Sequence, residues 1–367
     1  MATVKKDSTR TKTPYVCRWR DETGAQRKKG FARKVDADRF RAEIEHKLNT
    51  GTYIDPRAGK ITFQTYAEQW RAMQPHRPNT ARRTKSQLTR HAYPAFGARP
   101  IGQIRASEIQ AFVTGAKLSP SSVRPVFATV RAIMSAAMRD RLIGHDPCVR
   151  IKLPELPKSE IVPLTVDQVD ALSAAIDPRY RALVAAGAGA GLRQGELFGL
   201  QVADIDFLRR TMTLDRQVQP GPGGVVEVCP LKNRDSYRTI PLGKVVVDAL
   251  AAHLASYPVK GGQFVFRNPG GGALDRKWFN RHVWDPARDA ARLVGVTCHD
   301  LRHFYASALI RAGLNPKVVA ARLGHADASM TLKVYAHLWP DDEDRSRHAI
   351  DDVFRRDVPT MRPAKEG

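Results

Sequence analysis

The residues of this chain best suited to chemistry on an anionic substrate form an ordered series in its C-terminal half. Each lies in a short motif: Arg193 in GLRQGEL, Lys232 in PLKNR, His299 and Arg302 in HDLRH, His325 in LGH, and Tyr335 ten residues later. An arginine between glycines, just before a helix, can be held rigidly with its guanidinium exposed. Because His299 and Arg302 are three residues apart, they share one face of a helix.

These residue types suit cleavage of a phosphodiester without hydrolysis. A tyrosine hydroxyl can store the broken bond as a covalent intermediate. With an ordinary pKa of about 10 it is a modest nucleophile and a reasonable leaving group for rejoining. Arg193 and Arg302 could bind the non-bridging oxygens in a forked geometry and stabilise the charge of the transition state without a metal. We therefore assign Tyr335 as the nucleophile and the two arginines as the phosphate-binding pair.

The series resembles the catalytic set of the tyrosine recombinases, the phage integrase family: Arg in GxRxGEL, Lys in a hairpin turn, HxxR, LGH and then Tyr. The resemblance covers about residues 60–340. It implies that Lys232 protonates the departing 5′ oxygen, that His299 accepts or relays the tyrosine's proton, and that His325 hydrogen-bonds the scissile phosphate. It also implies that the tyrosine joins the 3′ phosphate and frees a 5′ hydroxyl, without metal, cofactor or ATP.

Other polar residues near these motifs are predicted to have structural roles. Glu196 is expected to buttress the Arg193 turn, and His303 and His337 are expected to be structural or peripheral. His299 and His303 are four residues apart, but they lack the HExxH pattern of zinc proteases, and a cation beside two arginines is unfavourable. No metal site is predicted, and the glycines before Arg193 fit no nucleotide-binding motif.

The charge of the chain points to nucleic acid as its partner. The 367 residues carry a formal net charge of +23, which calls for a polyanion. Residues 61–150 hold the largest basic excess, with 14 basic and 4 acidic residues. The longest apolar stretch, 182–192, is too short to span a bilayer, so a membrane is not expected. Four scattered cysteines fit a reducing compartment, and the expected location is the bacterial cytoplasm, at the host nucleoid.

Sequence patterns divide the chain into three domains and a tail. Residues 14–32 read as a hairpin and 36–49 as a helix, which gives a small β-sheet and helix domain over 1–57. A linker at 52–60 leads to a helical domain over 62–150, and a Pro-rich extended connector follows at 152–164. The residues expected to contact DNA are Arg18, Arg20, Lys28 and Lys29 on the strands, and Arg82, Arg83 and Lys85 in the helical domain.

Residues 165–340 combine helical patterns with grouped strands in a meander, and 341–367 read as a tail helix. The predicted fold class is α+β and multidomain. The catalytic domain is mainly helical with a small antiparallel sheet, the core-binding domain is helical, and the N-terminal domain resembles the arm-site-binding domain of phage integrases.

The resemblance implies a site-specific recombinase that integrates or excises phage or mobile-element DNA. Its expected partners are double-stranded DNA with core and arm attachment sites, and three further copies in a homotetramer. A host DNA-bending factor and an excision directionality factor are candidate partners. One alternative is a non-catalytic DNA-binding regulator on the same scaffold, although none of the six catalytic residues is lost. A type IB topoisomerase has similar chemistry, but the extra N-terminal module and the LGH motif favour a recombinase.

Overall fold

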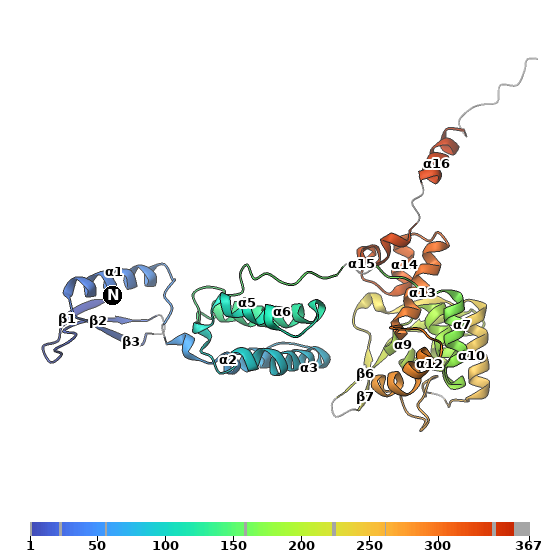
Figure 1. Cartoon of the computed structure of the whole chain (residues 1–367), viewed down its shortest axis with the longest axis horizontal. Helices are drawn as coiled ribbons and strands as arrows, with labels where there is room; N and C mark the ends of the chain where they lie inside the picture. Colours follow the sequence, from blue (N-terminus) through green and yellow to red (C-terminus); the bar gives the residue numbers. More distant parts are fainter. Residues whose placement is uncertain are drawn as a thin grey trace, which may run out of the picture. The chain divides into compact units, whose positions relative to one another are not determined.

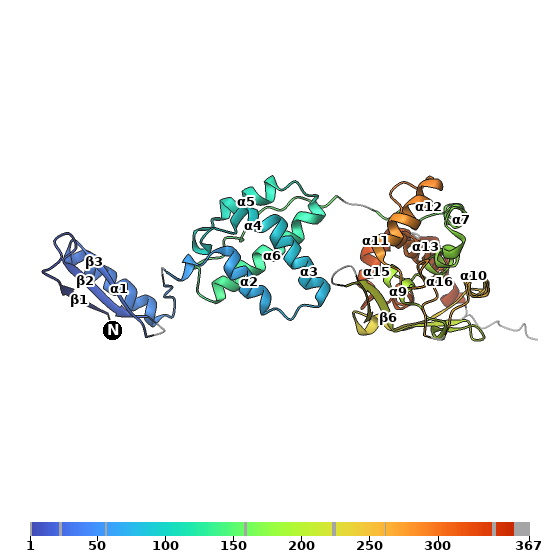
Figure 2. The same ribbon diagram turned by 90° about the horizontal axis from the view of Figure 1, so that it is seen from below.

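The computed structural model describes residues 2–21, 24–55, 57–157, 160–221, 225–260, 262–339 and 343–355. The chain forms two compact units, Met1–Lys158 and Ser159–Gly367 (Figures 1 and 2).

The first unit begins with a three-stranded antiparallel sheet that carries one helix. The strands are β1 (Thr3–Lys6), β2 (Tyr15–Arg20) and β3 (Gln26–Phe31), in the order β1-β2-β3, and α1 (Lys34–Asn49) packs against them. Cys17 and Trp19 of β2 are buried with Ile44 of α1. The predicted hairpin and helix are confirmed, whereas β1 was not predicted because its sequence TVKK has no apolar alternation.

The rest of the first unit is helical. It contains α2 (Phe63–Ala72), α3 (Pro78–Gln87), α4 (Tyr93–Phe96), α5 (Ala106–Gly115) and α6 (Pro120–Arg139). A π-helical turn, Leu88–Ala92, joins α3 to α4 without a break. Apolar residues at helical spacing, such as Phe63, Ile109 and Ile133, form its core. The helical character is confirmed, and α5 is an element that the sequence patterns did not indicate.

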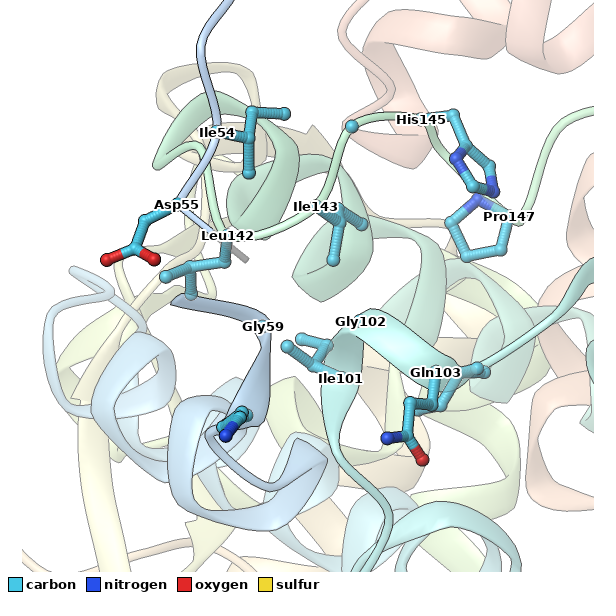
Figure 3. Close-up of a pocket in the computed structure, with 13 residues that line it drawn as sticks. Ile54, Asp55, Gly59, Ile101, Gly102, Gln103, Leu142, Ile143, His145 and Pro147 are labelled. Carbon is cyan, nitrogen blue, oxygen red and sulfur yellow. The ribbon is translucent and has the colours of Figure 1, made fainter. Parts of the chain in front are cut away.

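The linker before these helices is packed rather than free. A 3₁₀ turn (Ala58–Lys60) lies so close to the 101–104 turn that a Cβ on Gly59 would come within 3.0 Å of Gly102 Cα. A pocket of about 280 Å³ remains between the linker, the 101–104 turn and the 142–147 loop. Figure 3 shows Ile54 and Asp55 on the linker side of this pocket and Ile143 on the loop side. The packing limits the freedom of the linker.

The connector after α6 is also bound at its start. The Gln110 side chain accepts from the Lys152 backbone nitrogen (2.8 Å) and donates to the Lys152 carbonyl (3.0 Å). The Arg124 guanidinium donates twice to the Pro154 carbonyl, at 3.0 and 2.8 Å. The first residues of the predicted extended connector therefore belong to the helical domain.

The second unit is built around α8 (Arg181–Ala190), a buried helix of alanine and glycine that packs against α7 (Val166–Ala175), α10 (Lys244–Ser256) and α13 (Cys298–Arg311). Its glycines allow this close packing. A Cβ on Gly189 would lie 2.3 Å from Val246 Cγ2, and one on Gly187 would lie 2.7 Å from Leu301 Cδ1. The helix that precedes Arg193 is thereby fixed on three sides.

The strands of the second unit do not form the predicted meander. One sheet has the order β4-β5-β8, and β6 and β7 form a separate hairpin. The strands are β4 (Ile205–Asp206), β5 (Thr211–Leu214), β6 (Arg216–Pro220), β7 (Val226–Pro230) and β8 (Arg238–Pro241). The prediction of Lys232 in a hairpin turn is therefore wrong for this structure: Lys232 follows β7 on a segment that leads to a different sheet.

The second unit also contains further α-helices, most of which are short. They are α9 (Gln194–Gly199), α11 (Arg276–Phe279), α12 (Asp285–Ala290), α14 (Pro316–Leu323), α15 (Ala328–Tyr335) and, beyond residue 342, α16 (Glu343–Arg355). The predicted α+β class is confirmed. In the described part of the chain, no helix is both long enough and apolar enough to cross a membrane.

Gly191, which ends α8, should be intolerant of a side chain. Its φ is +65°, and a Cβ would lie 2.3 Å from Tyr305 Cδ1. Gly313 has a φ of +79°, and a Cβ there would meet no atom within 4 Å, so it serves as the matched control. We expect Gly313→Ala to lower the free energy of unfolding by about 1 kcal/mol, and Gly191→Ala by about 2–4 kcal/mol because overpacking adds to the backbone strain. Urea denaturation of both variants tests this, and equal losses would contradict it.

Candidate active site

A buried carboxylate organises the candidate site. Glu196 of α9 is 1% exposed. Its two oxygens accept hydrogen bonds from the Arg193 backbone nitrogen (2.9 Å) and Nη1 (2.8 Å), and from Arg238 Nη2 (2.9 Å) and Nη1 (3.2 Å). One acidic group thus fixes two guanidiniums, and it also closes the first turn of α9.

The charge of Glu196 is maintained by these partners. Burial alone would raise its pKa, but the hydrogen bonds and charge of Arg238, together with the charges of Arg193 and Arg302, lower the pKa to about 2. The carboxylate is therefore ionised at neutral pH. Because three arginines surround one carboxylate, the cluster keeps an excess of positive charge, which favours a bound anion.

Arg193 and Arg302 are tied to two consecutive peptide groups. Arg193 Nη2 donates to the Gly324 carbonyl (3.0 Å), and Arg302 Nη2 donates to the Leu323 carbonyl. Arg302 Nη1 also donates to the carbonyl of Gly191 (2.8 Å). The turn before α9 and the end of α14 are thereby joined, and the two guanidiniums are held at the same place.

The two arginines differ in exposure. The Arg193 side chain is 34% exposed, whereas Arg302 is 1% exposed. Burial and the neighbouring charge of Arg193 lower the pKa of Arg302 to about 9. It remains a cation at neutral pH. An arriving phosphate would meet Arg193 first, and it would offset the repulsion between the two cations.

Tyr335 is buried, and its hydroxyl is hydrogen-bonded. The residue is 2% exposed at the end of α15, and its Oη lies 2.7 Å from Nδ1 of His303 on α13. Burial raises the pKa of Tyr335 to about 12, although the charge of Arg302 opposes this shift. From the sequence, His303 is expected to be structural or peripheral, and His299 is expected to take the tyrosine's proton. The structure brings His303 to the hydroxyl, with the ring of His299 4.7 Å from that of His303.

His299 and His325 are close to the arginines and neutral. Desolvation, followed by the charges of neighbouring His303 and Arg302, lowers the pKa of His299 to about 4, although the residue as a whole is exposed. Desolvation and the charges of the arginines lower the pKa of His325 to about 4 as well. His325 Nδ1 lies 2.8 Å from the Thr331 hydroxyl. When Nδ1 accepts this bond, the neutral ring carries its proton on Nε2, where it can be donated to a phosphate oxygen.

Lys232 and Arg238 lie at the two ends of the segment that connects β7 to β8. Lys232 is exposed after β7, while Arg238 is 6% exposed and donates from Nε to the Arg322 carbonyl (2.8 Å). The segment that carries Lys232 is therefore anchored beside Glu196. In the sequence, Arg238 stands out only as a neighbour of Lys232. Its role depends on a contact with α9, 42 residues away, for which the sequence has no local signal.

The expected DNA-contacting residues of the N-terminal sheet fall on two faces. Arg18 pairs with Lys28 across the strands, and both are exposed, as is Arg20, on the face away from α1. Lys29 points to the other face, where its Nζ lies 4.4 Å from the ring centre of Phe40 on α1. The basic face of the sheet therefore includes three of the four predicted residues.

The basic residues predicted in the helical domain all lie on α3. Arg83 and Lys85 are exposed, and Arg82 is partly buried and donates to the Asn79 side chain. Contact of these residues with DNA stays a prediction.

Comparison with protein families identifies the chain. The model of the phage integrase family matches residues 163–341, and that of the phage integrase central domain matches residues 63–153. The integrase of Mycobacterium phage L5 is 26% identical over 319 residues, which is 83% of this chain and 84% of that protein. The chain belongs to the phage integrase family of tyrosine recombinases.

Solved structures share the fold. The Tn1549 transposon integrase in complex with a circular intermediate DNA has a TM-score of 0.68 at 20% identity, and the match covers 80% of this chain and 99% of that one. A lambda integrase tetramer bound to a Holliday junction has a TM-score of 0.57 at 17% identity, covering 89% and 96%.

The Glu196 cluster predicts an acid-dependent loss of stability. A pKa lowered from 4.5 to about 2 in the folded state stabilises the fold above pH 4.5, and that contribution is lost as the pH falls towards 2. The shift corresponds to about 3 kcal/mol at neutral pH. We expect Glu196→Gln to be less stable than the unsubstituted protein at pH 7 and to lose less stability between pH 5 and 3. Urea denaturation at several pH values measures this, and parallel pH profiles would contradict it.

Proposed function

We propose that this protein is a site-specific DNA recombinase of the integrase type. It would cleave and rejoin DNA strands through a 3′-phosphotyrosyl intermediate on Tyr335, and so integrate or excise phage or mobile-element DNA. The observation that carries this proposal is the attachment of Arg193 and Arg302 to the consecutive carbonyls of Gly324 and Leu323. Two fixed guanidiniums at one place are suited to the two non-bridging oxygens of a single phosphate.

The proposed chemistry gives each of these side chains one role. Tyr335 Oη attacks the phosphorus while Arg193 and Arg302 bind the non-bridging oxygens. The bond from phosphorus to the 5′ oxygen breaks, and Lys232 supplies the proton that this oxygen needs. His325 donates to the same phosphate. Rejoining is the reverse attack by a 5′ hydroxyl, which returns the phosphate bond without ATP.

Two of the side chains proposed to act on the phosphate, Tyr335 and Arg302, are buried. Tyr335 and Arg302 are 2% and 1% exposed, so a phosphate cannot reach them without movement of the surrounding segments. The short helix α15 carries the tyrosine at its last residue. We propose that DNA binding shifts α15 and so admits the phosphate, which would couple cleavage to DNA binding.

The proposed partners are duplex DNA, with core and arm attachment sites, and further copies of the chain in a tetramer. The DNA-bound neighbours, one of them a tetramer on a Holliday junction, support this proposal. Host bending and directionality factors stay candidate partners. A regulator without catalysis is the second candidate, but the intact arrangement of Arg193, Arg302, His325 and Tyr335 favours the enzyme.

Tyr335→Phe should abolish the covalent protein–DNA adduct and leave DNA binding unchanged. The substitution removes one oxygen from a side chain that stays packed, so the fold and the basic surfaces are retained. The substrate is a nicked duplex, selected by adduct formation with the unsubstituted protein from a pool of duplexes with random cores. Denaturing gels score the adduct, and gel shifts score binding. An adduct with the Phe variant would overturn the assignment of the nucleophile.

The two faces of the N-terminal sheet allow a matched test of arm-site binding. Arg18→Ala and Lys28→Ala each remove an exposed cation from the face away from α1, whereas Lys29→Ala removes one that lies over Phe40. We expect each of the first two to weaken arm-DNA binding and to reduce the slope of log affinity against log salt by about 1. Lys29→Ala should leave that slope unchanged. Equal effects of all three would contradict the assignment of the face.

A further inference from the structure

We propose that His303, rather than His299, is the catalytic residue that takes the proton of Tyr335 during strand cleavage. This inference rests on the proposed function and adds a seventh residue to the six predicted from the motifs. The observation behind it is the 2.7 Å contact between His303 Nδ1 and Tyr335 Oη.

The contact joins two separate helices. His303 lies in the second turn of α13, one residue after Arg302, and Tyr335 is the last residue of α15. Their rings are 5.6 Å apart and inclined by 64°, so the tyrosine meets the imidazole edge, where Nδ1 lies. The same stretch of α13 thus provides a cation for the phosphate and a base for the nucleophile.

Burial favours the neutral form of His303, which is the form that can accept a proton. Desolvation lowers its pKa, Asp300 on the same helix opposes that shift, and Arg302 adds to it. The other titratable groups in contact with His303 are His299 on the same helix and Tyr335 on α15. A neutral His303 with its proton on Nε2 offers the Nδ1 lone pair to the tyrosine hydroxyl.

The step balances without another reagent. The proton of Tyr335 Oη passes to His303 Nδ1 as the bond between oxygen and phosphorus forms. The 5′ oxygen leaves with a proton from Lys232. When the 5′ hydroxyl later attacks, it gives its proton back to the neutral Lys232, and His303 returns its proton to the tyrosine oxygen. Because burial raises the pKa of Tyr335 to about 12, little tyrosinate forms at neutral pH without such an acceptor.

A resting latch is the competing explanation for the same contact. If the bond to His303 only held Tyr335 away from the phosphate, its removal would speed cleavage. If His303 is the base, its removal slows cleavage. The proton of Tyr335 must then pass to hydroxide, so the cleavage rate rises with pH. The two explanations therefore predict opposite changes in rate.

The experiment compares His303→Asn with the unsubstituted protein on a selected nicked duplex that carries a 5′-bridging sulfur at the scissile position. The sulfur leaves as a thiolate without a proton, so the rate no longer depends on Lys232. Asparagine can place an acceptor oxygen near the position of Nδ1 but cannot take up a proton at neutral pH. His282→Asn is the control, since that histidine is exposed and bonds by Nδ1 to the Trp278 carbonyl of its own helix.

We expect His303→Asn to form the Tyr335 adduct on the order of a hundredfold more slowly at pH 7. Its rate should then rise by up to tenfold per pH unit from pH 7 to 9, because Tyr335 must first lose its proton to hydroxide from the solvent. The rates of the unsubstituted protein and of His282→Asn should change little over the same pH range. The sulfur substrate should restore the rate of adduct formation to Lys232→Ala but not to His303→Asn.

DNA binding and the thermal midpoint of unfolding verify that the variants are folded. His303→Gln is the second variant if His303→Asn is unstable.

Two results would overturn the inference. One is a rate for His303→Asn equal to or above that of the unsubstituted protein. The other is a slower rate whose pH profile stays flat, which indicates a structural role alone. Both leave the proposed function intact, because it fails only if the unsubstituted protein forms no adduct or if Tyr335→Phe still does.

Discussion

The site depends on one buried acidic side chain. Removing the Glu196 carboxylate from water is costly, and the cost is offset because Arg193 and Arg238 both donate to it. The three residues come from the turn after α8, from α9 and from β8. Arg238 and Arg193 then donate to the Arg322 and Gly324 carbonyls at the end of α14. Segments far apart in the sequence are thus held at fixed positions around one negative charge.

The same interaction leaves the arginine cluster around Glu196 positively charged, which favours a bound anion. Three guanidiniums against one carboxylate leave an excess of positive charge that only a further anion can offset. Arg302 donates to two backbone carbonyls, and the Tyr335 hydroxyl is hydrogen-bonded to His303. Both side chains can therefore be buried without losing hydrogen bonds to water. Desolvation and the neighbouring positive charges keep His299 and His325 neutral. A DNA phosphate would supply the missing charge, and its arrival would be linked to the exposure of the nucleophile.

The sequence predicted what is local and missed what depends on tertiary contacts. Sequence patterns indicated α1, the helical character of residues 62–150 and the helix that carries His299 and Arg302, and the motif order indicated the family. The pairing of β5 with β8 across an inserted hairpin has no local signature, so the meander and the Lys232 hairpin turn were wrong. Arg238 and His303 were not predicted as parts of the site, because their partners lie 42 and 32 residues away.

The central claim is that one DNA phosphate is bound by both Arg193 and Arg302 in line with the oxygen of Tyr335. A crystal structure of the protein on its nicked site, with vanadate in place of the scissile phosphate, measures this directly. We expect vanadate bonded to Tyr335 Oη and to the 5′ oxygen on opposite sides, with both guanidiniums on its equatorial oxygens. Vanadate held elsewhere, or Tyr335 and the arginines on different phosphates, would contradict it.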